Sequence, residues 1–88
     1  MRPVVLVSRD EAYATRRYVV VAAVTTRIRQ IPTEVTLGAS EGLPRESVAN
    51  CDDLRTIPQS MFVERIGAIT GDRLRALDAA LRFSLGLD

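Results

Sequence analysis

Apolar residues in the first two thirds of the chain come in short runs, each about the length of a β-strand. Residues 3–7 (PVVLV) and 18–24 (YVVVAAV) are continuously apolar, which is typical of buried strands. Residues 31–37 (IPTEVTL) alternate instead, and Pro32 suits the start of a strand. Together with shorter runs, the pattern predicts five or six strands, the later ones at residues 46–51, 54–58 and 65–69.

The last quarter of the chain changes to a helical period. Its leucines recur at spacings of three and four, with charged residues between them. Thr70 stands where a helix N-cap belongs, and Gly86 stands where a C-terminal glycine belongs. A single helical turn is predicted at residues 59–63, before this helix. The leucines expected to face the core are Leu74, Leu77, Leu81 and Leu85.

This order of elements predicts a β-rich α+β fold. We expect a small, strongly bent antiparallel sheet or partial barrel, with the C-terminal amphipathic helix packed against it. A chain of 88 residues makes one domain, here residues 1–88. Such a chain buries only roughly 60–65% of the surface that its unfolded form exposes, so a second copy or a protein partner is expected to add to the core.

The rarer residue types exclude several kinds of site. Cys51 is the only cysteine and there is no histidine, so a disulfide within the chain and the usual zinc sites are excluded. Cys51 is therefore interpreted as a small core residue. No apolar run approaches the roughly 18 residues that a membrane span needs, and the start of the chain does not resemble a secretory signal. These observations favour a cytoplasmic protein without membrane contact.

Charge is distributed unevenly along the sequence. Residues 1–33 hold six arginines against two acids, whereas residues 34–64 hold six acids against two arginines. All twelve basic residues are arginine, whose guanidinium binds phosphate in a bidentate fork. Codon bias also explains a chain without lysine, so the basic first third is the better indication of nucleic-acid binding.

Three segments of the sequence, in order, resemble the MazF/PemK toxins. Residues 2–8 (RPVVLVS) are similar to the family's arginine-proline strand ending in serine. Residues 24–26 (VTT), followed by 31–35 (IPTEV), are similar to its double-threonine strand end and next strand. Residues 51–57 (CDDLRTI) and 65–67 (RIG) resemble its aspartate-containing strand and the stretch before its helix.

The resemblance implies an SH3-like barrel that forms a homodimer and cleaves single-stranded RNA at short sequences. It also implies a small MazE-like antitoxin, whose acidic tail occupies the RNA groove. Family members begin with a further strand and loop before the arginine-proline pair, whereas here Met1 directly precedes Arg2. We therefore expect either that the sequence begins too late, with upstream codons missing, or that the chain is a shortened member with an incomplete groove and barrel.

The resemblance also assigns candidate site residues, and no metal or cofactor. The family's catalytic arginine and threonine match Arg2 and Thr25. The implied reaction is attack of a ribose 2′-hydroxyl on the adjacent phosphate, for which a guanidinium and a hydroxyl can stabilise the developing charge. Apart from the resemblance, Arg27 and Arg29 alternate on one face of a basic loop, where they can bind phosphate. With them, the RNA-binding candidates, each of which also has an ordinary structural interpretation, are Ser8, Thr26, Arg27 and Arg29.

Two other functions compete with the nuclease. One is a non-catalytic toxin of the same fold that inhibits a protein target such as DNA gyrase. The other is an inactive, truncated remnant that still binds antitoxin.

Asp52 and Asp53 form a carboxylate pair, but without histidine nearby we interpret them as structural or dimer-interface groups.

Overall fold

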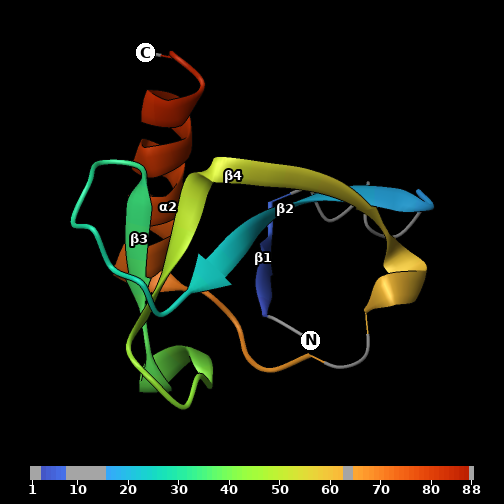
Figure 1. The fold of residues 1–88 in the computed structure, drawn as a ribbon, viewed down its shortest axis with the longest axis horizontal. Helices are drawn as coiled ribbons and strands as arrows, with labels where there is room; N and C mark the ends of the chain where they lie inside the picture. Colours follow the sequence, from blue (N-terminus) through green and yellow to red (C-terminus); the bar gives the residue numbers. More distant parts are fainter. Residues whose placement is uncertain (1–2, 8–15, 63–64, 88) are drawn as a thin grey trace.

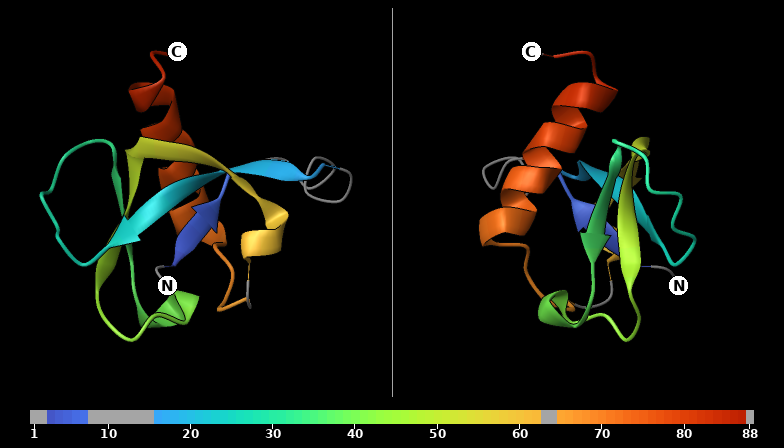
Figure 2. Two further views of the ribbon diagram at one scale, coloured as in Figure 1. Left: turned by 45° about the vertical axis from the view of Figure 1, so that its right-hand side comes forward. Right: turned by 90° about the vertical axis from the view of Figure 1, so that its left-hand side faces the viewer.

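The computed structural model of the chain describes residues 3–7, 16–62 and 65–87 (Figure 1). Four antiparallel strands form one sheet in the order β1-β2-β4-β3. A single α-helix among the described residues, α2, packs against one face of the sheet (Figure 2). This confirms the predicted fold class. The elements are β1 (Val4–Leu6), β2 (Tyr18–Thr25), β3 (Glu34–Leu37), the 3-10 turn η1 (Ala39–Glu41), β4 (Ser47–Pro58), the 3-10 turn η2 (Gln59–Met61) and α2 (Gly71–Ser84).

Strand β4 is one long, bent ribbon, where the sequence predicted two strands at 46–51 and 54–58 (Figure 1). Ala22 of β2 pairs with Leu54, but the next residue, Ala23, pairs with Asn50. The residues between, 51–53, have no partner on β2 and form a bulge. Their backbone is satisfied elsewhere, because the Cys51 N–H donates to the carbonyl of Thr33 across 2.8 Å.

The core lies between the sheet and α2. Because side chains alternate across a strand, every second residue of the sheet points to the helix. Burying one such valine or leucine contributes about 1.5–3 kcal/mol to stability. Cys51 is fully buried in this core, as predicted. The buried cluster comprises Val5, Ala22, Val24, Val35, Leu37, Ala49, Cys51, Leu77 and Ala80.

The predicted leucine stripe of α2 is only half correct. Leu77 is buried and Leu81 packs against the core, but Leu74 and Leu85 are 53% and 56% exposed. The buried residues of α2, Leu77 and Ala80, lie in its middle, and its C-terminal end extends past the sheet (Figure 2). Thr70 occupies the N-cap position without a side-chain bond, and Gly86 has the positive φ of 70° expected after the C-terminus.

Asp52 connects β4 to the end of α2 and to Thr33, the residue before β3. Its Oδ2 accepts a hydrogen bond from the Thr33 hydroxyl at 2.8 Å, and its Oδ1 lies 3.0 Å from the Ser84 hydroxyl. The same hydroxyl lies 2.7 Å from the carbonyl of Cys51. The end of α2 is thereby fixed to the bulge of β4, so Asp52 has a structural role, as predicted.

The predicted strand at residues 65–69 is wrong. The segment crosses the turn after η1 at close range, where it forms no ladder with a strand. Gly42, at a φ of 85°, and Gly67 make this approach possible. A Cβ on Gly67 would collide with the carbonyl of Glu41, and one on Gly42 would lie 2.6 Å from the carbonyl of Ile66. Glu41 also pairs with Arg73 of α2, with 3.8 Å between Oε2 and Nε.

No helix within the described ranges is long and apolar enough to cross a membrane.

We expect Gly67→Ala to lower the free energy of unfolding by about 1–3 kcal/mol, because the new methyl group must displace backbone at Glu41. The matched control is Gly38→Ala, since a Cβ at Gly38 meets nothing within 4 Å and its φ of −168° suits any residue. Urea unfolding followed by circular dichroism measures both. Equal stabilities of the two variants would contradict the close crossing.

Candidate nucleic-acid interface

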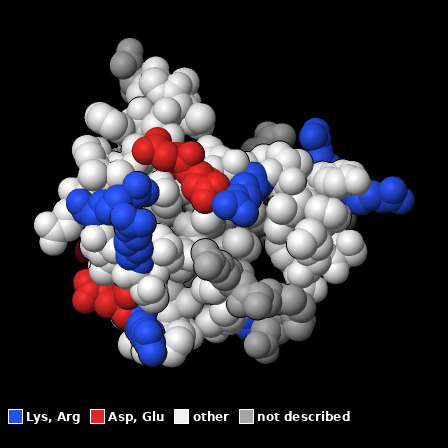
Figure 3. All heavy atoms as spheres, viewed as in Figure 1, with Lys and Arg blue, Asp and Glu red and all other residues white. Residues whose placement is uncertain are grey.

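The face of the sheet opposite α2 carries a row of residues that crosses all four strands. Val4 pairs with Ala23, Ala23 with Asn50, and Asn50 with Glu34. Their neighbours along each strand, such as Val5 and Ala22, point to the core. Arginines and acidic side chains lie side by side over this face (Figure 3).

A pocket of about 280 Å³ lies over this row. It is near the lower size limit of ligand-binding pockets, about 300 Å³. Its apolar lining comes from β1 and β2, and its polar lining comes from the end of β2, the loop after it and the bent part of β4. The apolar residues are Pro3, Val4, Val21, Ala23 and Val24, and the polar residues are Thr25, Arg27, Arg29, Asn50, Asp53 and Arg55.

Thr25, the predicted catalytic threonine, lies half-buried where β2 ends. Its Oγ1 accepts a hydrogen bond from the backbone N–H of Arg27 at 3.1 Å. This bond uses a lone pair of the hydroxyl, so the hydroxyl hydrogen remains available as a donor to a ligand. The same turn places the Arg27 side chain at the pocket.

Glu34 holds the loop that carries both predicted arginines of the pocket. Its Oε1 accepts the backbone N–H groups of Arg29 and Gln30, both at 2.9 Å, and its Oε2 accepts Arg29 Nε at 3.3 Å. Gln30 has a φ of 56°, which bends the chain back toward β3. The Glu34 side chain is only 2% exposed, so a buried charge fixes this loop.

The ionisation of Glu34 depends on these bonds. Burial opposes the charged form, but the hydrogen bonds from Arg29 and Gln30 outweigh it, so the pKa of Glu34 falls below its ordinary value. Glu34 is therefore a carboxylate at neutral pH. Arg29 is consequently held by a partner, whereas no described residue pairs with the Arg27 guanidinium.

Asp53 and Arg55 form a bidentate ion pair beside the bulge. Arg55 Nε lies 2.9 Å from Asp53 Oδ1, and Nη2 lies 3.0 Å from Oδ2. The hydrogen bond from Arg55 lowers the pKa of Asp53, and the same contact raises the pKa of Arg55. Both residues line the pocket, and the interpretation of Asp53 as a structural or dimer-interface group stays a prediction.

Sequence reasoning missed Asn50, Asp53 and Arg55. Asp53 and Arg55 stand two apart on one strand, a spacing that places them on the same face. The two-residue spacing could have paired them. It does not tell which face of the sheet they occupy, because the unpaired residues of the bulge shift the alternation of side chains along β4. Asn50 gave no motif signal at all.

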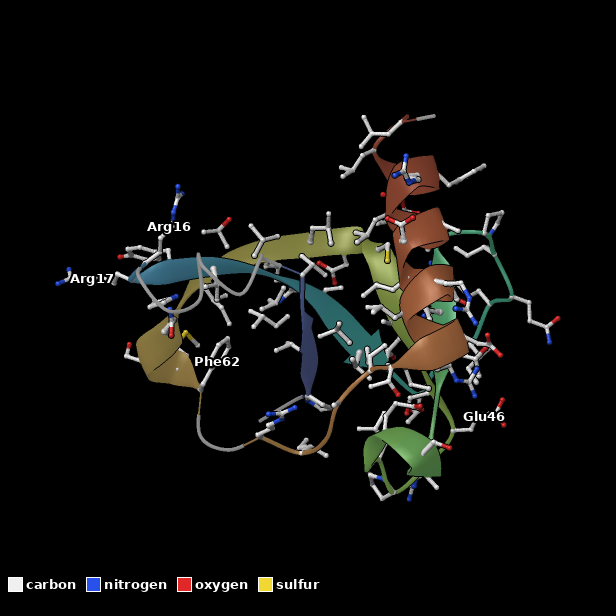
Figure 4. All side chains as sticks on the ribbon, turned by 180° about the vertical axis from the view of Figure 1, so that it is seen from behind. Arg16, Arg17, Glu46 and Phe62 are labelled. Carbon is white, nitrogen blue, oxygen red and sulfur yellow. The ribbon has the colours of Figure 1, made fainter. Side chains whose placement is uncertain are left out.

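The other predicted site residues do not line the pocket or lie outside the described residues. Thr26 is exposed and does not line the pocket. Arg2 and Ser8 lie outside the described residues, although Pro3, which follows Arg2, lines the pocket. Arg16 and Arg17 point outward at the start of β2 and also do not line it (Figure 4).

Other potential reactive groups do not gather here. Burial raises the pKa of the Cys51 thiol, and the neighbouring Asp52 charge adds to the effect, so the thiol stays neutral. Within residues 3–7, 16–62 and 65–87, no three histidine, cysteine, aspartate or glutamate side chains are grouped to hold a metal ion. The pocket therefore presents a hydroxyl, an amide and guanidinium groups above an apolar floor, which suits a phosphodiester with an attached base.

We expect Glu34→Gln to lower the free energy of unfolding at pH 7 by about 1–3 kcal/mol, because a neutral amide accepts hydrogen bonds more weakly than a buried carboxylate. Since the folded-state pKa of Glu34 is depressed, its contribution is present above the unfolded pKa of about 4.3 and is lost as pH falls through the folded value. The stability difference between wild type and Glu34→Gln should therefore shrink below about pH 4. Glu46→Gln, at an exposed glutamate that points outward, is the control (Figure 4); a constant difference across the pH range would contradict the role of the charge.

Comparison with known proteins places this geometry in a family. The family model of PemK-like, MazF-like toxins of type II toxin–antitoxin systems matches residues 1–85. A probable endoribonuclease of Mycobacterium tuberculosis, MazF5, is 38% identical over 85 residues, which cover 96% of this chain and 78% of that protein. The endoribonuclease MazF3 of the same species is 34% identical over 87 residues, covering 99% and 84%.

Solved structures of MazF toxins have the same fold as this chain. The M. tuberculosis toxin MazF-mt6 superposes with a TM-score of 0.94 at 34% identity, covering 99% of this chain and 88% of that one. A MazE–MazF structure from Deinococcus radiodurans gives a TM-score of 0.83 at 26% identity, covering 99% and 87%. Since the family model spans nearly the whole chain and the fold is shared, this protein belongs to the PemK/MazF family of toxins.

Proposed function

We propose that this chain is the toxin of a toxin–antitoxin system, an endoribonuclease that cleaves single-stranded RNA at short sequences without a metal ion. The observation that carries the proposal is the gathering of Thr25, Arg27 and Arg29 at one pocket, in a chain of the PemK/MazF family. The curated relatives described above are named endoribonucleases, which favours this function over a gyrase-type inhibitor.

The reaction is a transesterification within the RNA. The 2′-oxygen of one ribose attacks the adjacent phosphorus and loses its proton, and the bond from phosphorus to the 5′-oxygen of the next nucleotide breaks. That oxygen takes up a proton, so the products are a 2′,3′-cyclic phosphate and a free 5′-hydroxyl. Negative charge grows on the phosphoryl oxygens in the transition state, where a fixed donor stabilises it.

Thr25 supplies one such donor. Its hydroxyl is oriented by the Arg27 N–H, and its hydrogen is directed to the phosphate. Arg2 supplies a second through its guanidinium. Because arginine stays protonated in proteins, it is poorly matched to proton transfer at neutral pH, so Arg2 serves mainly as an electrostatic clamp.

The other predicted residues bind the RNA strand. Arg27, without an ion-pair partner among the described residues, contacts a backbone phosphate directly. Arg29 adds positive charge while Glu34 holds its position. Ser8 and Thr26 are further candidate contacts to the strand.

The same proposal includes one domain over residues 1–88, a homodimer, a MazE-like antitoxin and a cytoplasmic location. A mycobacterial endoribonuclease whose structure was solved in complex with its cognate antitoxin shares this fold, with a TM-score of 0.89 at 30% identity. Large apolar residues are exposed along α2 and just after it, which supports a dimer that covers part of this helix. They include Leu74, Phe83, Leu85 and Leu87.

In EDTA, we expect the purified chain to cleave a defined single-stranded RNA and to leave cyclic-phosphate ends. Arg2→Ala and Thr25→Ala should each slow the reaction by roughly 10²–10³-fold, the usual effect of removing one charge-stabilising donor. Thr25→Ser, which restores the hydroxyl, should recover most of the rate. End-group analysis and single-turnover kinetics measure these changes.

The matched control is Arg45→Ala, which removes an exposed arginine outside the pocket and should cleave like wild type. Cleavage that Thr25→Ala does not slow would contradict the assignment of Thr25. Growth inhibition that persists in Thr25→Ala, without RNA cleavage, would favour a protein-inhibiting toxin instead.

At micromolar concentration, light scattering should give twice the mass of the 88-residue chain. Phe83→Glu should shift the population toward the monomer, because a charge at an apolar interface loses its water. Arg75→Glu, on an exposed part of the same helix, is the control. A wild-type monomer under these conditions would exclude the homodimer.

A further inference from the structure

Asn50 is a polar residue of the pocket that the proposed chemistry does not use. It lies half-buried on β4, immediately before the bulge at residues 51–53. Its neighbours in the cross-strand row are Ala23 on β2 and Glu34 on β3. The small side chain of Ala23 leaves space beside the amide, and both residues line the pocket.

The bulge fixes which way this amide faces. The Asp52 N–H donates to Asn50 Oδ1 at 3.0 Å. Because an amide nitrogen cannot accept a hydrogen bond, this backbone donor identifies the oxygen and settles the orientation. The Nδ2 group keeps two N–H donors, and no described residue accepts from them. The side chain therefore presents two donors at Nδ2, while its oxygen is held toward the bulge by the Asp52 N–H.

Sequence in RNA is read at base edges, while phosphate contacts only position the strand. The arginines of the pocket suit the phosphates, and Arg55 already uses Nε and Nη2 on Asp53. Beneath them, Val4, Val21 and Ala23 form an apolar floor, which suits the flat face of an unstacked base. A volume of about 280 Å³ has room for one base.

We propose that this pocket holds one unstacked base of the RNA next to the cleaved bond, and that Asn50 determines which base it accepts by donating from Nδ2 to a carbonyl oxygen. This inference rests on the proposed function, because it assumes an RNA ligand. The usual amide–adenine pair needs both the amide oxygen and nitrogen. Here the Asp52 N–H draws the oxygen toward the bulge and leaves Nδ2 for the base. The site therefore favours guanine, uracil or cytosine, whose carbonyl oxygens accept from Nδ2, over adenine, which accepts only at ring nitrogens.

The test uses a random single-stranded RNA pool and the full chain. Both the cut ends and the protein-bound fraction are sequenced, for wild type, Asn50→Asp and Asn50→Ala. In wild type, one position near the cut should be depleted of adenine. Asn50→Asp keeps an acceptor for the Asp52 N–H but replaces the donor by an acceptor, so its preference at that position should shift roughly tenfold toward bases with an amino group, adenine included.

Asn50→Ala should flatten the preference at the same position and leave the others unchanged. Two control variants distinguish a loss of base recognition from a general effect of mutation and from a loss of phosphate binding. Thr36→Ala, exposed on β3 outside the pocket, should keep the wild-type sequence profile. Arg27→Ala should weaken binding across all sequences alike, because a phosphate contact carries no sequence information.

Two results would overturn the inference: a wild-type profile without base preference at any position, or the same profile in wild type and both Asn50 variants. Failure of the proposed function is seen separately, as intact RNA with wild type. In that case the bound fraction still decides, since a shift there between wild type and Asn50→Asp supports the base-reading role and its absence excludes it.

Discussion

The bulge in β4 is the constraint on which the rest of this structure depends. Residues 51–53 have no partner on β2, and their polar groups are satisfied by Thr33, Asn50 and the end of α2. Because the strand bends there, residues 47–50 of β4 pair with β3 and with the end of β2, next to the helix. Residues 54–58 pair with the first part of β2 alone. The same irregularity directs Cys51 to the core, Asp52 to the helix and Asp53 to the pocket.

The pocket is built before any ligand arrives. Glu34 is buried as a carboxylate, which is costly alone but is offset by two backbone N–H groups and the Arg29 side chain. Asp53 holds Arg55 in a similar way at the surface, where solvent screens the pair and its contribution to stability is small. Both carboxylates thus restrict arginine side chains, which lowers the entropy that binding must remove.

The sequence predicts the strands and helix well because apolar runs and periodicity report burial directly. It fails at residues 65–69, where an apolar run crosses a turn through glycine contacts and never meets a strand edge. It also overextends the buried stripe of α2 to Leu74 and Leu85, since periodicity does not tell how far a small sheet reaches. Thr25 follows from the family motif and Arg27 and Arg29 from a basic loop, whereas Asn50, Asp53 and Arg55 depend on a register shift that no local pattern reveals.

Glu34 and Asn50 are both held by backbone N–H groups, but they constrain different parts of the sequence. Glu34 binds the loop chiefly through main-chain N–H groups, which every residue except proline provides. The side chains at positions 27 and 29 can therefore be exchanged while the loop keeps its shape. Position 50 has less freedom, because only short acceptors such as asparagine, aspartate, serine or threonine keep the bond to the Asp52 N–H. Relatives that diverge from this chain would thus alter the affinity of the groove gradually, through the loop, but would change position 50 only among a few residue types.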